Sequence, residues 1–391
     1  MGMAGRPRPN PRSLALANVP VLFYLATMAR VLDLTADPRL LKGRGASTNA
    51  SGRFEHERRW LLDDGWQAAT EKPAPPLKTQ ILHDASRSII THNRSPDISF
   101  DQSINPYRGC EHGCIYCFAR PSHAYLGLSP GADFESRILV KPEAARLLRE
   151  ELSAPGYVPR VIAIGTNTDP YQPVERNLKI MRQILEVLIE FRHPVAIVTK
   201  SALVLRDCDI LGAMARQGLA KVALSITTLD PSLARRLEPR AATPSRRLAA
   251  LRGLSAEGIP AAVMFAPVIP ALNDSELENI LAAAAKAGAQ TAGYVLLRLP
   301  LEVKELFREW LKQHAPDRAE HVLSLIRAMR RGRDYDANWH QRMTGTGPYA
   351  SIIAQRFHLS ARRLGLNQSP VVLESGRFRR PPTRGEQLSL L

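Results

Sequence analysis

Cysteine is scarce in this sequence of 391 residues, which has only four, at positions 110, 114, 117 and 208. Three of them lie within eight positions, so they do not form the pattern of an extracellular disulfide framework. A cluster of this kind in a large chain indicates metal binding, which requires reduced thiols. The sequence therefore predicts a cytoplasmic protein.

Long uninterrupted apolar runs are also missing. The most apolar stretch, residues 14–32, is broken by Asn18, Pro20 and Arg30, and its longest clean part is about half of the ~20 residues that a membrane span requires. Basic residues before it imitate a signal peptide, but no small-x-small cleavage site follows. We therefore expect no membrane partner, and a start codon at Met28 would explain the stretch.

Neither a G-x-G-x-x-G motif after a strand nor a P-loop motif is present, so dinucleotide binding and P-loop chemistry lack support. What the sequence does have is basic charge, with a formal net charge of +16. That charge favours partners that carry phosphates, although many basic proteins simply remain soluble.

From about residue 100 onward, short β-branched runs alternate with amphipathic segments. Expected strands lie near residues 102–108, 160–166, 194–200, 221–227, 261–269 and 291–299. The helices expected between them cover residues 176–191, 203–216, 243–257 and 274–287. Continuous apolar strands separated by helices indicate parallel pairing, so the fold class is α/β. Six strand-helix units predict a partial (β/α)6 TIM-like barrel with an N-terminal extension and C-terminal helices.

The domain boundaries follow from the same pattern. We expect a basic, partly irregular N-terminal extension over residues 1–95 and the barrel over residues 96–300. Three amphipathic patterns predict a C-terminal helical region over residues 301–370. The Arg- and Pro-rich residues 371–391 are expected to form a flexible tail.

Sulfur ligands select zinc, copper(I) or iron–sulfur clusters. Structural zinc normally takes four protein ligands, and only His112, His123 or the distant Cys208 are candidates to complete that set. A 4Fe-4S cluster held by Cys110, Cys114 and Cys117 would instead leave one iron open to a substrate or cofactor. The spacing favours the cluster.

The C-x-x-x-C-x-x-C loop, with Tyr116 before the last cysteine and the first barrel strand ahead of it, resembles the cluster loop of radical S-adenosylmethionine (radical SAM) enzymes. The resemblance implies a 4Fe-4S cluster and S-adenosylmethionine as cofactors, with reductive cleavage to a 5′-deoxyadenosyl radical. It also implies that Tyr116 packs near the adenine. An electron donor such as flavodoxin or ferredoxin is then an expected partner.

Within that superfamily the sequence is most similar to the spore photoproduct lyase-like group, through "VTK" (198–200), "LSIT" (224–227) and "LEPR" (237–240). The resemblance implies that Lys200 meets the cofactor carboxylate and Ser225 the ribose. The backbone of the turn that starts with Gly165, Thr166 and Asn167 would bind the methionyl amino group. Without the motif, Lys200 would be a solvated strand end, Ser225 a backbone cap and the turn an ordinary polar one.

The sequence departs from this group at one place. The group uses a cysteine after the second strand as a hydrogen donor, whereas residues 161–175 contain none and Gly165 stands near the expected position. Cys208 is expected to be a buried small hydrophobic residue on a helix. Candidate radical relays are Tyr171, Tyr335 and Tyr349. Asp169 and Glu175 are either a polar pair above the barrel or a turn residue and a helix N-terminal acid.

Two further elements, "TDPYQPVE" (168–175) and "RMTGTGPYA" (342–350), are interpreted as fixed elements placed for a substrate. Two functions therefore remain open. One is a radical SAM enzyme that acts on nucleic acid, in DNA repair or modification. The other is a nucleic-acid-binding or adaptor protein with a structural metal centre.

DNA is an expected partner, and the replication sliding clamp is another. The C-terminal residues resemble the peptide by which bacterial repair proteins bind the replication sliding clamp. The residues of that peptide are Gln387, Leu388, Ser389, Leu390 and Leu391.

Overall fold

A sheet of seven strands forms the centre of the molecule in the computed structural model, which describes residues 30–32, 43–55, 61–63 and 77–382. The sheet has the order β12-β11-β10-β9-β8-β5-β4. Six strands are parallel, and the edge strand β4 pairs antiparallel with β5. The strands are β4 (Ile90–His92), β5 (Gln102–Ile104), β8 (Ile162–Ile164), β9 (Val195–Thr199), β10 (Ala220–Ser225), β11 (Ala261–Val268) and β12 (Thr291–Leu296).

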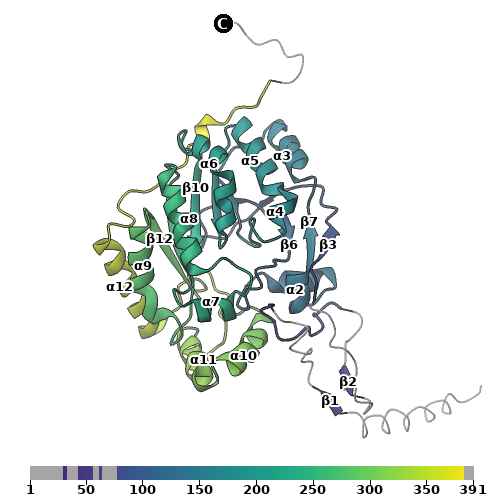
Figure 1. Cartoon of the computed structure of the whole chain (residues 1–391), viewed down its shortest axis with the longest axis vertical. Coiled ribbons are helices and arrows are strands. Elements are labelled where there is room, and N and C mark those ends of the chain that lie inside the picture. The colour runs from purple at the N-terminus through teal and green to yellow at the C-terminus, as the bar shows by residue number, and fades with distance from the viewer. Residues whose placement is uncertain (1–29, 33–42, 56–60, 64–76, 383–391) are drawn as a thin grey trace, which may run out of the picture.

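Helices connect the parallel strands, and those whose apolar residues pack in the main core cover one face of the sheet. They are α3 (Ala144–Ser153), α4 (Glu175–Leu178), α5 (Ile180–Glu190), α6 (Cys208–Ala215), α7 (Pro231–Leu237), α8 (Pro244–Ala256) and α9 (Leu277–Lys286), with 3-10 turns η2 (Ala202–Asp207) and η3 (Asp274–Glu276). Figure 1 shows β12 and α12 at one side of the molecule and β3, β6 and β7 at the other. The predicted α/β class and partial barrel are confirmed.

Side chains alternate along the strands between two environments. One set, which includes Ile164, Ile197, Leu224 and Phe265, is fully buried and packs in the same core as the helices. The other set consists mainly of small residues that are only partly buried on the strands β9 to β12: Ala196, Val198, Ala223, Ala262, Met264 and Gly293. The inner face of the sheet is therefore lined mainly by small side chains.

Residues 118–153 contain elements that the sequence pattern did not reveal. They are η1 (Arg120–Leu126), α2 (Ala132–Ser136), β7 (Arg137–Val140) and α3. The strand β7 lies between β3 (Gln80–His83) and β6 (Tyr107–Arg108) in a second sheet of three strands. A separate pair joins β1 (Arg30–Leu32) to β2 (Leu61–Asp63).

Three helices and a 3-10 turn follow the barrel: α10 (Val303–His314), η4 (Pro316–Arg318), α11 (Ala319–Ala328) and α12 (Gly347–Arg363). The apolar faces of α10 and α11, which include Phe307 and Trp310, form a second core with residues of the cysteine loop. The apolar face of α12 packs in the main core instead. In Figure 1, α10 and α11 lie beside α7. No helix in the described ranges is both long and apolar enough for a membrane span.

Three sequence predictions need correction in detail. The helix expected over residues 176–191 is interrupted at Lys179, whose φ is 52°. Within the expected extension, β4 joins the main sheet. Within the expected tail, Phe378 packs near Tyr157, Phe191 and His193, and residues 375–377 form η5 (Ser375–Arg377), so residues 371–382 lie on the body of the protein.

Candidate active site at the cysteine loop

The loop that carries the three cysteines owes its shape to two glycines. Gly109 and Gly113 have φ angles of 83° and 66°, a region that side chains other than glycine rarely adopt. A Cβ atom on Gly109 would lie 2.9 Å from the carbonyl oxygen of Phe134. The loop is then fixed from behind, because the Cys110 N–H donates to that same carbonyl at 2.9 Å.

Cys110 and Cys114 are buried, whereas Cys117 is partly exposed, so the loop opens to solvent on the Cys117 side. Burial raises the pKa of all three thiols, Asp169 and then the neighbouring thiols raise it further for Cys110, and Glu238 raises it further for Cys114. Lys200 opposes this shift at Cys114 and Cys117. A bound metal would therefore have to hold these groups as thiolates.

Arg120 is a buried side chain that binds the cysteine loop from behind. It is fully buried and donates to the carbonyl oxygens of Cys114 at 2.9 Å and Gly113 at 3.2 Å. It also pairs with the buried carboxylate of Glu135. Glu135 accepts hydrogen bonds from Gly45 N and Ala46 N at 2.7 and 2.8 Å, and Gly45 lies against the backbone of Gly113, so these two residues of the N-terminal region pack directly against the cysteine loop.

Lys200 and Ser225 meet at the carboxyl ends of β9 and β10. The ammonium of Lys200 donates to the hydroxyl of Ser225 at 2.9 Å and lies 5.8 Å from the ring centroid of Tyr116. Ser225 in turn donates to the carbonyl of Ala266 at 3.0 Å. The structure thus places three predicted site residues, Tyr116, Lys200 and Ser225, beside the cysteine loop.

A buried network behind Tyr116 was not found by the sequence analysis. The Tyr116 hydroxyl donates to Glu238, which also accepts from Thr227 at 2.5 Å and pairs with the buried guanidinium of Arg247. Burial alone would raise the pKa of Glu238, but Arg247 and then Lys200 overcome this effect and hold it at about 2. The network fixes the ring of Tyr116. The "LEPR" motif contains Glu238 and was the one available signal.

The turn after β8 depends on Gly165, whose φ is 89°. A Cβ atom at Gly165 would lie 2.0 Å from the carbonyl oxygen of Val198 on β9. Thr166 is partly buried and Asn167 is exposed, and the Asn167 N–H donates to Asn105 at 3.1 Å. This predicted part of the site therefore sits over the first two parallel strands, beside the start of the cysteine loop.

Asp169 and Glu175 do not form a polar pair. Asp169 accepts from Thr199 at 2.6 Å and from Lys200 N at 2.7 Å, and it lies 3.3 Å from His112 Nδ1. Burial would raise the pKa of Asp169, but His112 and these donors lower it to about 2. Glu175 accepts from the N–H groups of Ile180 and Met181, so it caps α5. The structural interpretation is confirmed for Glu175.

The candidates for a fourth zinc ligand lie apart. His112 faces Asp169, and His123 is buried with its Nε2 3.0 Å from the carbonyl oxygen of Arg137. Cys208 is partly buried at the start of α6, packed against the main core. In the described ranges, no three His, Cys, Asp or Glu side chains converge on a single-ion site.

The three candidate relay tyrosines also differ in position. Tyr171 is buried and donates to Asp207 at 3.1 Å, and Tyr349 donates to Asp274 at 2.6 Å. Tyr335 lies near Arg298, whose guanidinium is 4.7 Å from the ring centroid of Phe118. Of the three, Tyr335 is therefore linked to the cysteine loop through a single intervening side chain.

Segment 342–350 holds two distant parts of the barrel together. The carbonyl of Met343 accepts from Leu296 N at 2.8 Å, at the end of β12. Arg342 pairs with the buried carboxylate of Asp97 in the loop between β4 and β5. The segment therefore joins the last strand to the loop that precedes the first parallel strand.

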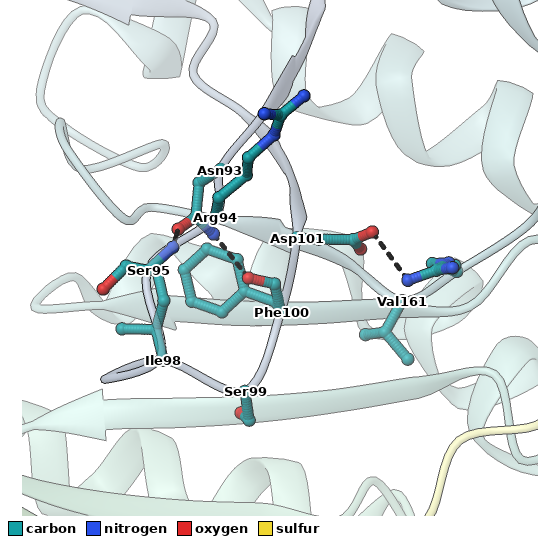
Figure 2. Close-up of a pocket in the computed structure, with 9 residues that line it drawn as sticks. Asn93, Arg94, Ser95, Ile98, Ser99, Phe100, Asp101 and Val161 are labelled. Carbon is teal, nitrogen blue, oxygen red and sulfur yellow. Dashed lines mark hydrogen bonds and ion pairs between the residues drawn. The ribbon is translucent and has the colours of Figure 1, made fainter.

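A pocket of about 460 Å³ lies away from these residues. It is lined by the loop 93–101 and by Arg160 and Val161, which precede β5 and β8. Arg160 donates to Asp101 at 2.9 Å, and Figure 2 shows Asn93 directed toward the carbonyl of Phe100. This pocket is therefore at the amino ends of the strands, opposite the cysteine loop. It contains none of the predicted site residues.

Ligand sites of parallel α/β sheets lie at the carboxyl ends of the strands, where the cysteine loop, Lys200 and Ser225 are gathered.

The Radical SAM superfamily model matches residues 104–284. An uncharacterised protein of Mycobacterium tuberculosis H37Rv is 38% identical over 232 residues, which is 59% of this chain and 68% of that protein. Another from Methanocaldococcus jannaschii is 27% identical over 245 residues, covering 63% and 87% of the two chains.

Among solved structures, spore photoproduct lyase complexed with dinucleoside spore photoproduct has a similar fold, with a TM-score of 0.54 and 16% identity. The match covers 73% of this chain and 80% of that one. A mutant of the same lyase gives a TM-score of 0.53 at 15% identity over the same shares. The fold and site define a radical enzyme of the partial-barrel type. This chain belongs to the radical SAM superfamily.

Proposed function

We propose that Cys110, Cys114 and Cys117 bind a 4Fe-4S cluster. The observation that carries this proposal is the placement of three thiols on one short loop whose Cys117 side is open. The fit is supported by charge, because Lys200 acts on Cys114 and Cys117, Arg247 on Cys114 and Arg120 on Cys117. These cations would offset the negative charge of thiolate ligands. When bound, the cluster would supply the electron that cleaves S-adenosylmethionine.

S-adenosylmethionine is proposed to bind between the cysteine loop and the strand ends. Lys200 has a flexible ammonium group at the end of β9 and is suited to a carboxylate. Ser225 presents a hydroxyl beside it, and the Tyr116 ring is held by Glu238. The turn over Gly165, Thr166 and Asn167 offers backbone groups to the methionyl amino end. The small side chains on the inner face of the sheet leave space for this ligand.

The substrate is proposed to be nucleic acid, in a DNA repair or modification reaction in the cytoplasm. Support comes from the net charge of +16 and from the fold shared with a lyase that was solved in complex with a dinucleoside photoproduct. The lesion reversal of that lyase is not proposed here. The turn after β8 lacks a cysteine, and Gly165 has no space for a side chain. Flavodoxin or ferredoxin is the proposed electron donor.

One assay separates this enzyme from a binding protein with a structural metal. The protein is reconstituted anaerobically with iron and sulfide, then mixed with dithionite and S-adenosylmethionine. We expect release of 5′-deoxyadenosine and methionine by the wild type and none by a variant with the three loop cysteines replaced by alanine. Iron-replete wild-type protein that releases no 5′-deoxyadenosine would contradict the proposed function.

A further inference from the structure

Arg298 is an arginine with few partners, two residues beyond the end of β12. Its neighbours Leu297 and Leu299 are buried in the second core, while Arg298 is only partly buried. Its Nε is buried and has no hydrogen-bond partner among the described residues. Nη1 lies 3.6 Å from Met343 Sδ and Nη2 lies 3.5 Å from the Tyr335 hydroxyl, and both contacts are long.

The other buried arginines near the loop are satisfied very differently. Arg120 pairs with Glu135 and Arg247 pairs with Glu238, and each also donates to backbone carbonyls. No carboxylate of the described residues forms an ion pair with Arg298. The buried Nε of Arg298 has lost water without gaining an acceptor, which is costly, and an anionic ligand would remove that cost.

A second cation reinforces the positive charge at this place. Arg330 is almost fully buried and donates to the carbonyl oxygens of Leu297 at 3.0 Å and Gln341 at 2.6 Å. Because Leu297 directly precedes Arg298, the bond to Leu297 brings the two cations close together, and burial and then the charge of Arg298 lower the pKa of Arg330. Asp336 is the acid whose charge acts on Arg330, and its Oδ1 already accepts from Asn338 N.

The guanidinium of Arg298 lies over Phe118, which directly follows Cys117. The ring of Phe118 is 40% exposed, although it belongs to a loop that is otherwise mostly buried. Arg298 is 4.7 Å from the centroid of this ring. A positive group and an exposed aromatic ring side by side are suited to a nucleotide, because phosphate binds the cation and a base packs on the ring.

We propose that Arg298 and Phe118 form the substrate-binding site and hold one nucleotide unit of a nucleic acid beside the cysteine loop. The phosphodiester binds Arg298, and the base packs against the exposed part of Phe118. This proposal rests on the proposed function and names the part of the substrate that the enzyme recognises. Arg330 acts as a positioning residue, because its N–H groups already donate to the carbonyl oxygens of Leu297 and Gln341 and are not available to the phosphodiester.

The test measures binding of a fluorescein-labelled single-stranded DNA of 20 nucleotides to reconstituted full-length protein by anisotropy, between about 50 and 200 mM salt. Arg298→Gln should weaken binding roughly tenfold and reduce the salt slope by about one. Arg298→Lys, which keeps the charge, should restore most of the affinity. The matched control Arg363→Gln removes the same charge from an exposed position on α12 and should change binding little.

Phe118 is tested in the same way. Phe118→Ala should weaken binding roughly fivefold to a hundredfold, as expected for loss of one base–aromatic contact, while Phe118→Tyr should bind like the wild type. Circular dichroism and iron content of each variant establish that it is folded.

Equal affinities of Arg298→Gln and Arg363→Gln would overturn the proposal, as would a wild type that binds no DNA. Competition by polyglutamate that depends on Arg298 and matches that of unlabelled DNA would also overturn it in favour of an acidic peptide. Release of 5′-deoxyadenosine by the same wild-type sample is measured in parallel. A sample that releases it and fails the binding test contradicts this inference alone, whereas a sample that releases none contradicts the proposed function.

Discussion

Gly165 and Val198 approach each other so closely that a Cβ atom on Gly165 would lie 2.0 Å from the Val198 carbonyl oxygen. The contact joins the turn after β8 to β9, so it positions the residues proposed to receive the methionyl amino group. It also explains why no side chain that donates hydrogen can stand at this position without a backbone shift.

Gly165→Ala should therefore destabilise the protein and displace the turn. The expected loss is about 2–4 kcal/mol, since both the left-handed φ and the steric overlap must be relieved. Gly156→Ala is the matched control, because Gly156 has a φ of 81° with no atom within 4 Å of its added Cβ. Urea unfolding of both variants gives the difference. Equal losses would mean that backbone strain alone matters.

The cysteine assignment is tested by metal content. We expect the variant in which Cys110, Cys114 and Cys117 are all alanine to lose iron, sulfide and the absorbance near ~400 nm. Cys208→Ala should keep all three, since Cys208 lies at the start of α6 in the main core. Iron retained by the triple variant, or zinc alone in the wild type, would show that the cluster assignment is wrong.

Lys200→Met should weaken binding of S-adenosylmethionine about tenfold to a hundredfold, because a charge-assisted contact contributes roughly 1.5–3 kcal/mol. Lys221→Met is a suitable control. Lys221 is the second residue of β10 in the same sheet, and its ammonium donates to the Val371 carbonyl and not to Ser225. Equilibrium dialysis measures both affinities, with iron content as the check on the cluster. If Lys200→Met binds normally, Arg240 is the next candidate, although it is paired with Glu111 at 3.3 Å.

The buried pair of Glu238 and Arg247 makes a prediction about pH. The pKa of Glu238 is about 2 in the folded protein and ordinarily about 4.5, so its contribution to stability is present above pH ~4.5 and is lost as pH falls toward 2. Glu238→Gln should cost about 3–5 kcal/mol at pH 7, because it leaves Arg247 buried without its counter-charge.

The same substitution should also flatten the loss of stability between pH 5 and pH ~3. Glu278→Gln, at the surface pair with Arg356, is the control and should change stability by no more than about 1 kcal/mol. Denaturant unfolding at pH 7, 5, 4 and 3 checks both variants. A Glu238→Gln protein as acid-sensitive as the wild type would contradict the role of this carboxylate.

The C-terminal peptide Gln387–Leu391 lies outside the described residues, and its binding to the sliding clamp stays a prediction. Deleting residues 387–391 should abolish binding to the purified clamp and leave iron content and 5′-deoxyadenosine release intact. Surface plasmon resonance with both proteins measures the effect. No binding by the full-length chain at tens of micromolar, a range of about −6 kcal/mol, would remove the clamp as a partner.

The barrel strands were predictable because each is a short, mainly apolar run, in which fully buried residues alternate with partly buried ones, as in β9 and β10. The elements between the cysteine loop and β8 were not. The five-residue helix α2 carries a fully buried acid, Glu135, which only its contacts with Arg120 and the distant Gly45 explain. The break at Lys179 likewise depends on Glu175 capping α5.

At the site, the motif residues could be predicted from the sequence, whereas the residues that hold them in place could not. Cysteine spacing and strand ends are local features, so the positions of the three thiols, Lys200 and Ser225 could be anticipated. The roles of Thr227 and Arg247 arise from side chains that meet only after the barrel forms. Arg298 gave no signal at all, because its importance lies in the partners it lacks.

The cysteine loop is held in place by residues that come before it and by residues that come after it in the sequence. Ile115 N donates to the carbonyl of Leu237, Arg240 N donates to that of His112, and Glu135 holds Gly45 and Ala46 against the loop. During synthesis the three thiols therefore leave the ribosome well before Leu237 and Arg240 exist. Until then they are exposed to oxidants and to competing metals, so the timing of insertion of the proposed cluster relative to translation would determine the yield of active protein.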